Sequence, residues 1–184
     1  MAARKPAQSF APGDNPQHRD AAVLGSASGE PPESVCPTHR WYDVPMAPPM
    51  AAEALGRPAF AIADLVEELA LSWSPEPVEI GLVETAGGVR SPIAGDGDCV
   101  QLCQALGPDL VLLVADAGLG TINAVRLSTG SFGAVATDVV VVLNRFDPTQ
   151  DVHVRNAEWL RSRDGLTVVE MPGAAMELSA VVSG

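Results

Sequence analysis

Residues 110–123 read LVLLVADAGLGTIN, and this stretch decides the fold class. Its six apolar residues, 110–115, are typical of a strand that is buried on both faces, as in a parallel sheet. Asp116 ends the run, a glycine-rich turn follows, and residues 122–129 have a helical pattern. A buried strand, a tight turn and a helix form the repeating unit of parallel α/β folds.

The same rhythm recurs on both sides of this stretch. Further β-branched runs at residues 78–83, 139–143 and 166–169 predict three more strands. Apolar stripes predict helices around residues 62–69, 99–106 and 153–163, and Asp98 is placed to cap the second of these. Parallel strands need right-handed crossovers, so we expect an α/β fold with three layers and a mostly parallel sheet.

The length of 184 residues is that of one domain, and we expect a single domain spanning residues 1–184. Composition nevertheless changes along the chain. Residues 1–60 hold most of the 16 prolines and are expected to form loops and short helices, whereas residues 61–184 alternate strands and helices.

Charge and hydropathy exclude several classes of protein. The formal net charge is −12, which argues against a nucleic-acid partner. The longest apolar runs are far shorter than the roughly 20 residues that a membrane-spanning helix needs. The first 20 residues contain no apolar signal region, and three cysteines suit a reducing compartment, so we expect a cytoplasmic protein.

Polar residues follow each predicted strand, namely Glu84, Asp116, Asn144 and Glu170. Because the carboxyl ends of parallel strands line the ligand crevice of an open sheet, we expect a binding site there. Glycine-rich turns follow Glu84 and Asp116, and backbone amides at such turns can hold an anion. The alternative for each turn is a tight bend that needs a positive φ.

Several segments resemble dethiobiotin synthetase, a ligase of the phosphate-loop NTPase type. They are LVETAGG (82–88), ADAGLGTIN (115–123), VVLNR (141–145), KPAQS (5–9), PMAPP (45–49) and GRP (56–58). The resemblance implies a biotin-biosynthesis enzyme that uses CO2 and MgATP to close a ureido ring on 7,8-diaminopelargonic acid. The reaction would pass through a carbamate and a carbamic–phosphoric anhydride. The resemblance also implies a homodimer that holds the substrate carboxylate across its interface.

The resemblance assigns a role to each matching residue. Lys5 is expected to be catalytic, and Asp20 and Glu84 are expected to bind Mg2+. The residues expected to bind substrate are Ser9, Gly120, Thr121, Ile122 and Asn123. The residues expected to bind ATP are Glu84, Ala86, Gly87, Gly88, Asn144, Arg145, Met171, Pro172 and Gly173.

The sequence also departs from the family pattern. It contains no G-x-x-x-x-G-K-[ST] motif, so the resemblance implies that the first strand–loop–helix unit of the fold is missing. Phe10 stands where a small glycine is expected, and Thr85 replaces the glycine between Glu84 and Ala86.

These departures keep two alternatives open beside the ligase. One is a non-catalytic relative that binds a carboxylate ligand without ATP turnover. The other is a different phosphate-loop ligase, such as an amidotransferase-type synthetase acting on another acid.

Overall fold

A computed structural model describes residues 1–73, 78–133 and 138–183. The chain forms two compact units, Met1–Leu106 and Gly107–Gly184. The compositional boundary near residue 60 falls inside the first unit, so it does not mark a structural division. The single-domain expectation stays a prediction.

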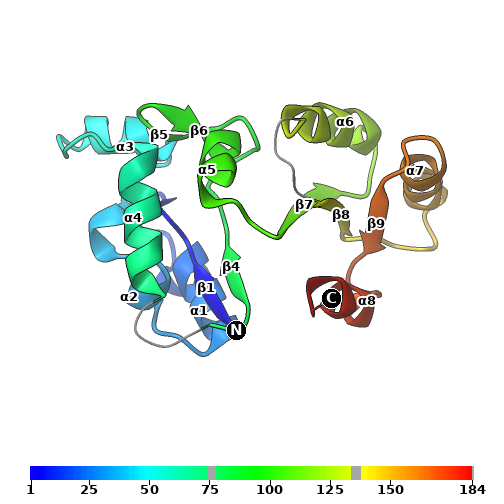
Figure 1. The fold of residues 1–184 in the computed structure, drawn as a ribbon, viewed down its shortest axis with the longest axis horizontal. Coiled ribbons are helices and arrows are strands. Elements are labelled where there is room, and N and C mark those ends of the chain that lie inside the picture. The colour runs from blue at the N-terminus through cyan, green and yellow to red at the C-terminus, as the bar shows by residue number, and fades with distance from the viewer. Residues whose placement is uncertain (74–77, 134–137, 184) are drawn as a thin grey trace. The chain divides into compact units, whose positions relative to one another are not determined.

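The strands of the first unit form three pairs (Figure 1). Strand β1 (Ala2–Arg4) pairs in parallel with β4 (Gly81–Val83), and β2 (Gln8–Ser9) pairs in parallel with β3 (Trp41–Tyr42). Strand β5 (Pro92–Ala94) lies antiparallel to β6 (Gly97–Asp98). The β1–β4 register aligns Arg4 with Val83, and this alignment positions the residues that follow both strands.

Helices complete the first unit. They are η1 (Pro16–His18), α1 (Asp20–Ser28), α2 (Pro32–Val35), η2 (Thr38–Arg40), α3 (Pro48–Ala54), α4 (Ile62–Ser72) and α5 (Cys99–Leu106). Helix α4 buries Leu65 and Leu69, as its apolar stripe predicted. The predicted cap of α5 is confirmed, because Asp98 Oδ1 accepts from the amide of Val100 at 2.9 Å.

The second unit contains a three-stranded parallel sheet. Its strands are β7 (Leu110–Asp116), β8 (Asp138–Asn144) and β9 (Thr167–Glu170), in the order β7–β8–β9. Helices α6 (Thr121–Ser131) and α7 (Asp151–Ser162) connect them, and α8 (Ala175–Ser183) follows β9. The register pairs Asp116 with Asn144, so these two residues lie side by side at the carboxyl ends of β7 and β8.

The α/β class and the mostly parallel pairing are therefore confirmed, but the sheets are small. The expectation that every strand is buried on both faces is wrong for β4 and β7. Val114 of β7 is 62% exposed, whereas β8 buries four consecutive residues. Within the described ranges β7 pairs only with β8, and β4 pairs only with β1, so each strand has one edge without a neighbour.

Two further differences concern element length. The predicted strand at residues 78–83 is shorter, since β4 begins at Gly81. Strands β1, β2 and β3 of the proline-rich part were not predicted, because segments of two or three residues are too short to show a period. No described helix combines the length and the hydropathy needed to cross a membrane.

Candidate active site

The side chain of Lys5 is the centre of a charged cluster in the first unit. It is only 2% exposed, and its Nζ lies 2.7 Å from Asp20 Oδ2 and 2.7 Å from Glu84 Oε1. The same ammonium donates a hydrogen bond to the carbonyl oxygen of Thr85 at 2.9 Å. Three residues that the sequence assigned to the site are thus brought together within the first unit.

The backbone explains this convergence. Lys5 follows β1 and Glu84 follows β4, and the amide of Glu84 donates to the carbonyl of Arg4 at 2.9 Å. Both residues therefore leave the parallel pair at the same level. Asp20 is the first residue of α1, whose next amide, that of Ala21, donates to the side-chain oxygen of Gln8 at 3.1 Å.

The chemistry of the cluster suits a divalent cation. The Asp20 and Glu84 carboxylates already share one cation, the Lys5 ammonium, and their side chains are 49% and 47% exposed. Mg2+ prefers oxygen ligands and keeps water or phosphate in its remaining positions, so two accessible carboxylates fit it. The described residues contain no group of three or more histidine, cysteine or acidic side chains that could enclose a metal alone.

The contact of Lys5 with Thr85 does not involve the threonine side chain. Lys5 contacts the backbone carbonyl of Thr85, which any residue supplies. The adjacent turn depends on Gly87, whose φ is +77° and whose added Cβ would lie 2.7 Å from Ser91 Oγ. The amide of Gly88 donates to that hydroxyl at 2.9 Å, so it has a partner within the turn. The ATP-binding role of Ala86, Gly87 and Gly88 stays a prediction.

Ser9 lies beside the cluster and lines a pocket of about 260 Å3. We call it the loop pocket, and it is lined by Gln8, Ser9, Phe10, Asp14, Asn15, His18, Arg19 and Asp20. Asp20 therefore belongs both to the loop pocket and to the Lys5 cluster. A larger cleft of about 540 Å3 in the first unit, lined by Arg40, Tyr42, Arg57 and Phe60 among others, contains none of the predicted site residues.

The glycine turn of the second unit is held by side chains. Asp116 Oδ1 accepts from the amide of Gly118 at 2.8 Å, and its other oxygen pairs with the guanidinium of Arg145. These hydrogen bonds lower the pKa of Asp116 below its ordinary value of 3.8. Gly120 has a φ of +93° and caps α6, so the predicted helix N-terminus begins at Thr121.

The predicted adenine-side residues also meet within the second unit. The amide of Met171 donates to the carbonyl of Leu143 at 2.9 Å, and the amide of Phe146 donates to the carbonyl of Met171 at 2.9 Å. Asn144 and Arg145 therefore lie next to the segment that begins at Met171. Arg145 has a φ of +56°, a left-handed conformation that is uncommon outside glycine and clusters at functional sites.

Comparison with known proteins shows which family the chain belongs to. A model of the AAA domain matches residues 5–171. An ATP-dependent dethiobiotin synthetase of an Anaeromyxobacter species is 38% identical over 156 residues, which are 82% of this chain and 65% of the relative. That of Phenylobacterium zucineum is 32% identical over 169 residues, which are 88% of this chain and 70% of the relative. The chain belongs to the dethiobiotin synthetase family.

The chain spans about 65% of the length of the Anaeromyxobacter dethiobiotin synthetase. The site residues assigned from the dethiobiotin synthetase pattern lie on both units. The first unit carries Lys5, Ser9, Asp20, Glu84, Ala86, Gly87 and Gly88, and the second carries Gly120, Thr121, Ile122, Asn123, Asn144, Arg145, Met171, Pro172 and Gly173.

Sequence reasoning about the dethiobiotin synthetase pattern missed two residues that shape these sites. The side-chain oxygen of Gln8 accepts from the amide of Ala21 and so orders the start of α1. Gln8 lies in the KPAQS segment, and the resemblance of this segment to the family pattern was the signal that could have identified it. Asn156 of α7 donates to the carbonyls of Ala117 and Gly118 at 2.9 Å each. No sequence signal pointed to Asn156, because its partners are about 40 residues away.

Proposed function

We propose that this chain acts as an ATP-dependent dethiobiotin synthetase, closing a ureido ring on 7,8-diaminopelargonic acid with CO2 and MgATP. The observation that supports it most is the position of Lys5 Nζ, 2.7 Å from each of two carboxylates that the family pattern assigns to magnesium. We also propose that the fold has the three layers and the parallel sheet of phosphate-loop NTPases.

In this proposal Asp20 and Glu84 hold Mg2+, which neutralises phosphate charge when it is bound. Lys5 then directs its ammonium at the oxygens of the substrate carbamate and of the transferred phosphoryl group. Its burial supports this role, because a preorganised charge in a water-poor site stabilises developing negative charge better than a solvated one. Ser9 supplies a hydroxyl at the adjacent loop pocket.

The second unit supplies the remaining contacts of the proposal. The amides at the N-terminus of α6, from Gly120 to Asn123, suit the substrate carboxylate, and in a homodimer they would serve it across the interface. Asn144 suits the adenine base, since a carboxamide offers both a donor and an acceptor. Residues 171–173 lie beside it.

The test is ATP-dependent incorporation of labelled bicarbonate into an acid-stable product from the diamine. We expect Lys5→Ala to reduce turnover by roughly 100-fold or more, because a charge aimed at the reacting oxygens is lost. Glu84→Gln should raise the Mg2+ concentration needed for half-maximal turnover. The matched control is Glu67→Gln, an exposed residue of α4, which should leave both quantities unchanged.

Circular dichroism of each variant separates loss of the site from loss of the fold. Near-normal turnover of a folded Lys5→Ala variant would remove Lys5 from the reaction. A Mg2+ requirement that Glu84→Gln leaves unchanged would remove the metal assignment.

A second candidate function is ligand binding without catalysis. It is supported by the N-terminus of α6, whose amides can hold a carboxylate whether or not ATP is turned over. Saturable binding of the diamine, together with an absence of ATP turnover, would select this candidate. Binding of a different carboxylic acid in place of the diamine would instead select another phosphate-loop ligase.

A further inference from the structure

The loop formed by residues 86–91 carries the two glycines that are expected to bind ATP, and its own hydrogen bonds close it. The amide of Ser91 donates to the carbonyl of Gly88 at 2.8 Å, and the amide of Gly88 donates to the Ser91 hydroxyl at 2.9 Å. Gly87, with a φ of +77°, lies directly before this closed turn. These contacts fix the shape of the 86–91 loop, but they do not attach it to the rest of the first unit.

The first residue of α5 contacts both ends of the 86–91 loop. The Sγ atom of Cys99 lies 3.5 Å from the carbonyl oxygen of Ala86, where the loop begins, and 3.6 Å from that of Ser91, where it ends. A thiol is a weak donor, and one donor can be shared between two carbonyl oxygens. Ala86 also packs against the core cluster that contains Cys99. The thiol therefore bridges the two ends of the loop.

Helix α5 holds this thiol in place. Cys99 is 4% exposed, and the cap of the helix fixes the backbone around it. Asp98 Oδ1 accepts from the amide of Gln101 at 3.2 Å, and Gln101 Oε1 accepts from the amide of Asp98 at 2.7 Å. The other carboxylate oxygen of Asp98 forms an ion pair with Arg90 of the loop at 3.0 Å. The start of α5 thus contacts the loop through two neighbouring side chains.

The Cys99 thiol is suited to donate a hydrogen bond rather than to act as a nucleophile. Burial raises the pKa of this thiol above its ordinary value of 9.0, and a hydrogen bond with the Thr85 side chain offsets only part of the rise. The proton therefore stays on the sulfur at neutral pH. The carbonyl of Thr85 accepts from Lys5 at 2.9 Å, so the ammonium and the thiol hold the consecutive carbonyls of Thr85 and Ala86.

We propose that Cys99 is a positioning residue whose thiol holds the 86–91 loop in the place where it meets the nucleotide. This inference rests on the proposed function and on the ATP-binding role predicted for residues 86–88. The thiol acts through the carbonyl of Ala86, which it keeps next to the backbone that Lys5 contacts. A loop that is ordered in advance binds its ligand more tightly, because less conformational entropy is lost on binding.

The first measurement is amide hydrogen exchange on the full chain labelled with 15N, without nucleotide. Exchange of the Gly88 and Ser91 amides reports how often the 86–91 loop opens. We expect Cys99→Ala to speed the exchange of both amides about threefold or more, because a hydrogen bond that holds the loop is lost. The amides of the second turn of α5 should exchange as they do in the parent chain.

Two further variants separate the hydrogen bond from packing. Cys99→Ser keeps a donor on a side chain of similar shape, so its loop exchange should stay close to that of the parent. Cys103→Ala removes a half-buried thiol one turn further along α5 and should leave loop exchange unchanged. The inference is overturned if a folded Cys99→Ala variant shows unchanged loop exchange, if Cys99→Ser speeds it equally, or if exchange rises equally along α5.

The second measurement is a titration of each chain with MgATP, followed by the shift of the Gly88 signal. We expect Cys99→Ala to raise the Kd for MgATP about threefold or more, since the cost of ordering the loop is added to binding. Cys99→Ser and Cys103→Ala should bind as the parent does. An unchanged Kd in Cys99→Ala would overturn the positioning role.

The titration also distinguishes failure of this inference from failure of the proposed function. A parent chain that binds MgATP with the expected Cys99 dependence, but fixes no CO2, would contradict the proposed reaction alone. A parent chain that binds no MgATP would contradict both. A parent chain that fixes CO2 while Cys99→Ala leaves the Kd unchanged would contradict the positioning role alone.

Discussion

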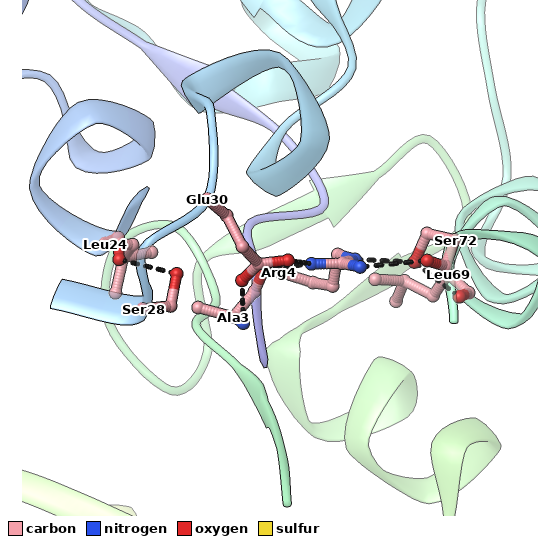
Figure 2. Close-up of polar contacts among 7 residues, drawn as sticks. All are labelled: Ala3, Arg4, Leu24, Ser28, Glu30, Leu69 and Ser72. Atoms are coloured by element: carbon pink, nitrogen blue, oxygen red, sulfur yellow. Dashed lines mark hydrogen bonds and ion pairs between the residues drawn. The ribbon is translucent and has the colours of Figure 1, made fainter. Parts of the chain in front are cut away.

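The buried guanidinium of Arg4 connects several segments of the first unit. The guanidinium forms an ion pair with Glu30 at 2.6 Å and donates to Ser72 Oγ and to the Ser72 carbonyl at 2.8 Å each (Figure 2). The guanidinium also lies over the ring of Trp73. Glu30 also accepts from the amide of Ala3 at 2.8 Å. One arginine thus ties strand β1 to the end of α4 and to the loop that follows α1.

The Glu30 carboxylate makes stability depend on pH. Burial alone would raise the pKa of Glu30, but hydrogen bonds from the Ala3 amide and the Arg4 guanidinium outweigh it, so its pKa lies below the ordinary 4.5. A lowered pKa stabilises the fold above pH 4.5, and this contribution is lost as the pH falls through the folded-state value. We expect Glu30→Gln to cost about 1 kcal/mol at pH 7 and less at pH 3.

Urea unfolding of both proteins across this range measures the difference. Glu33→Gln, an exposed carboxylate of α2, is the control and should show no such trend. A cost that stays the same at pH 3 would show that the charge of Glu30 is not what stabilises Arg4.

The cysteines give a second prediction at this scale. Cys36 is fully buried, and burial raises the pKa of its thiol to about 12, whereas Cys103 is half-buried. The thiolate is the reactive form, so we expect iodoacetamide to alkylate Cys103 before Cys36 in the folded chain at pH 8. Peptide mass spectrometry after timed quenching reads the order, and the reverse order would contradict the packing around Cys36. In urea both thiols should react at similar rates.

At the scale of an element, the turn between β7 and α6 depends on another helix. The side-chain amide of Asn156 on α7 donates to the carbonyls of Ala117 and Gly118. These two carbonyls precede Gly120, which caps α6. Helix α7 therefore holds the turn that the proposed carboxylate site requires.

Removing this amide should loosen the turn. We expect Asn156→Ala to lower the free energy of unfolding by about 1–3 kcal/mol, because it removes the side-chain donor of the Ala117 carbonyl and leaves the Gly118 carbonyl with only the amide of Thr121. Asn123→Ala, an exposed position on α6, is the matched control and should change stability little. Thermal denaturation of both variants is the measurement, and equal effects would show that α7 does not support the turn.

At the scale of the whole molecule, the chain carries a large net negative charge. Acidic residues number 23 and basic residues 11, which leaves a net charge of −12. The excess carboxylates repel one another in the folded state. Salt screens this repulsion beyond a Debye length of about 8–10 Å at physiological ionic strength.

We therefore expect the melting temperature at pH 7 to rise when sodium chloride increases from about 20 mM to about 200 mM. Near pH 4.4, the isoelectric point of the sequence, the same change should have little effect. Calorimetry at both pH values makes the comparison. A fall in melting temperature at pH 7 would mean that screened ion pairs, such as Arg126 with Asp164, outweigh the repulsion.

The α/β class, the main strands and helices of residues 62–170 and the Asp98 cap followed from the sequence alone. Local signals determine them: continuous β-branched runs, apolar stripes of period 3.6 and a side chain that accepts from the amide two residues on. The family was also readable, because short segments such as LVETAGG and ADAGLGTIN carry it. The uneven burial of β4 and β7 was not readable, since it depends on which strands are neighbours.

Only the tertiary structure decided how the charged groups meet. Lys5, Asp20 and Glu84 are separated by up to 79 positions along the chain, and parallel pairing of β1 with β4 brings the first and last together. The contact of the Arg19 guanidinium with the Phe10 ring likewise joins two residues nine positions apart. Sequence patterns report the period and composition of one element, whereas a site is a set of distances between elements.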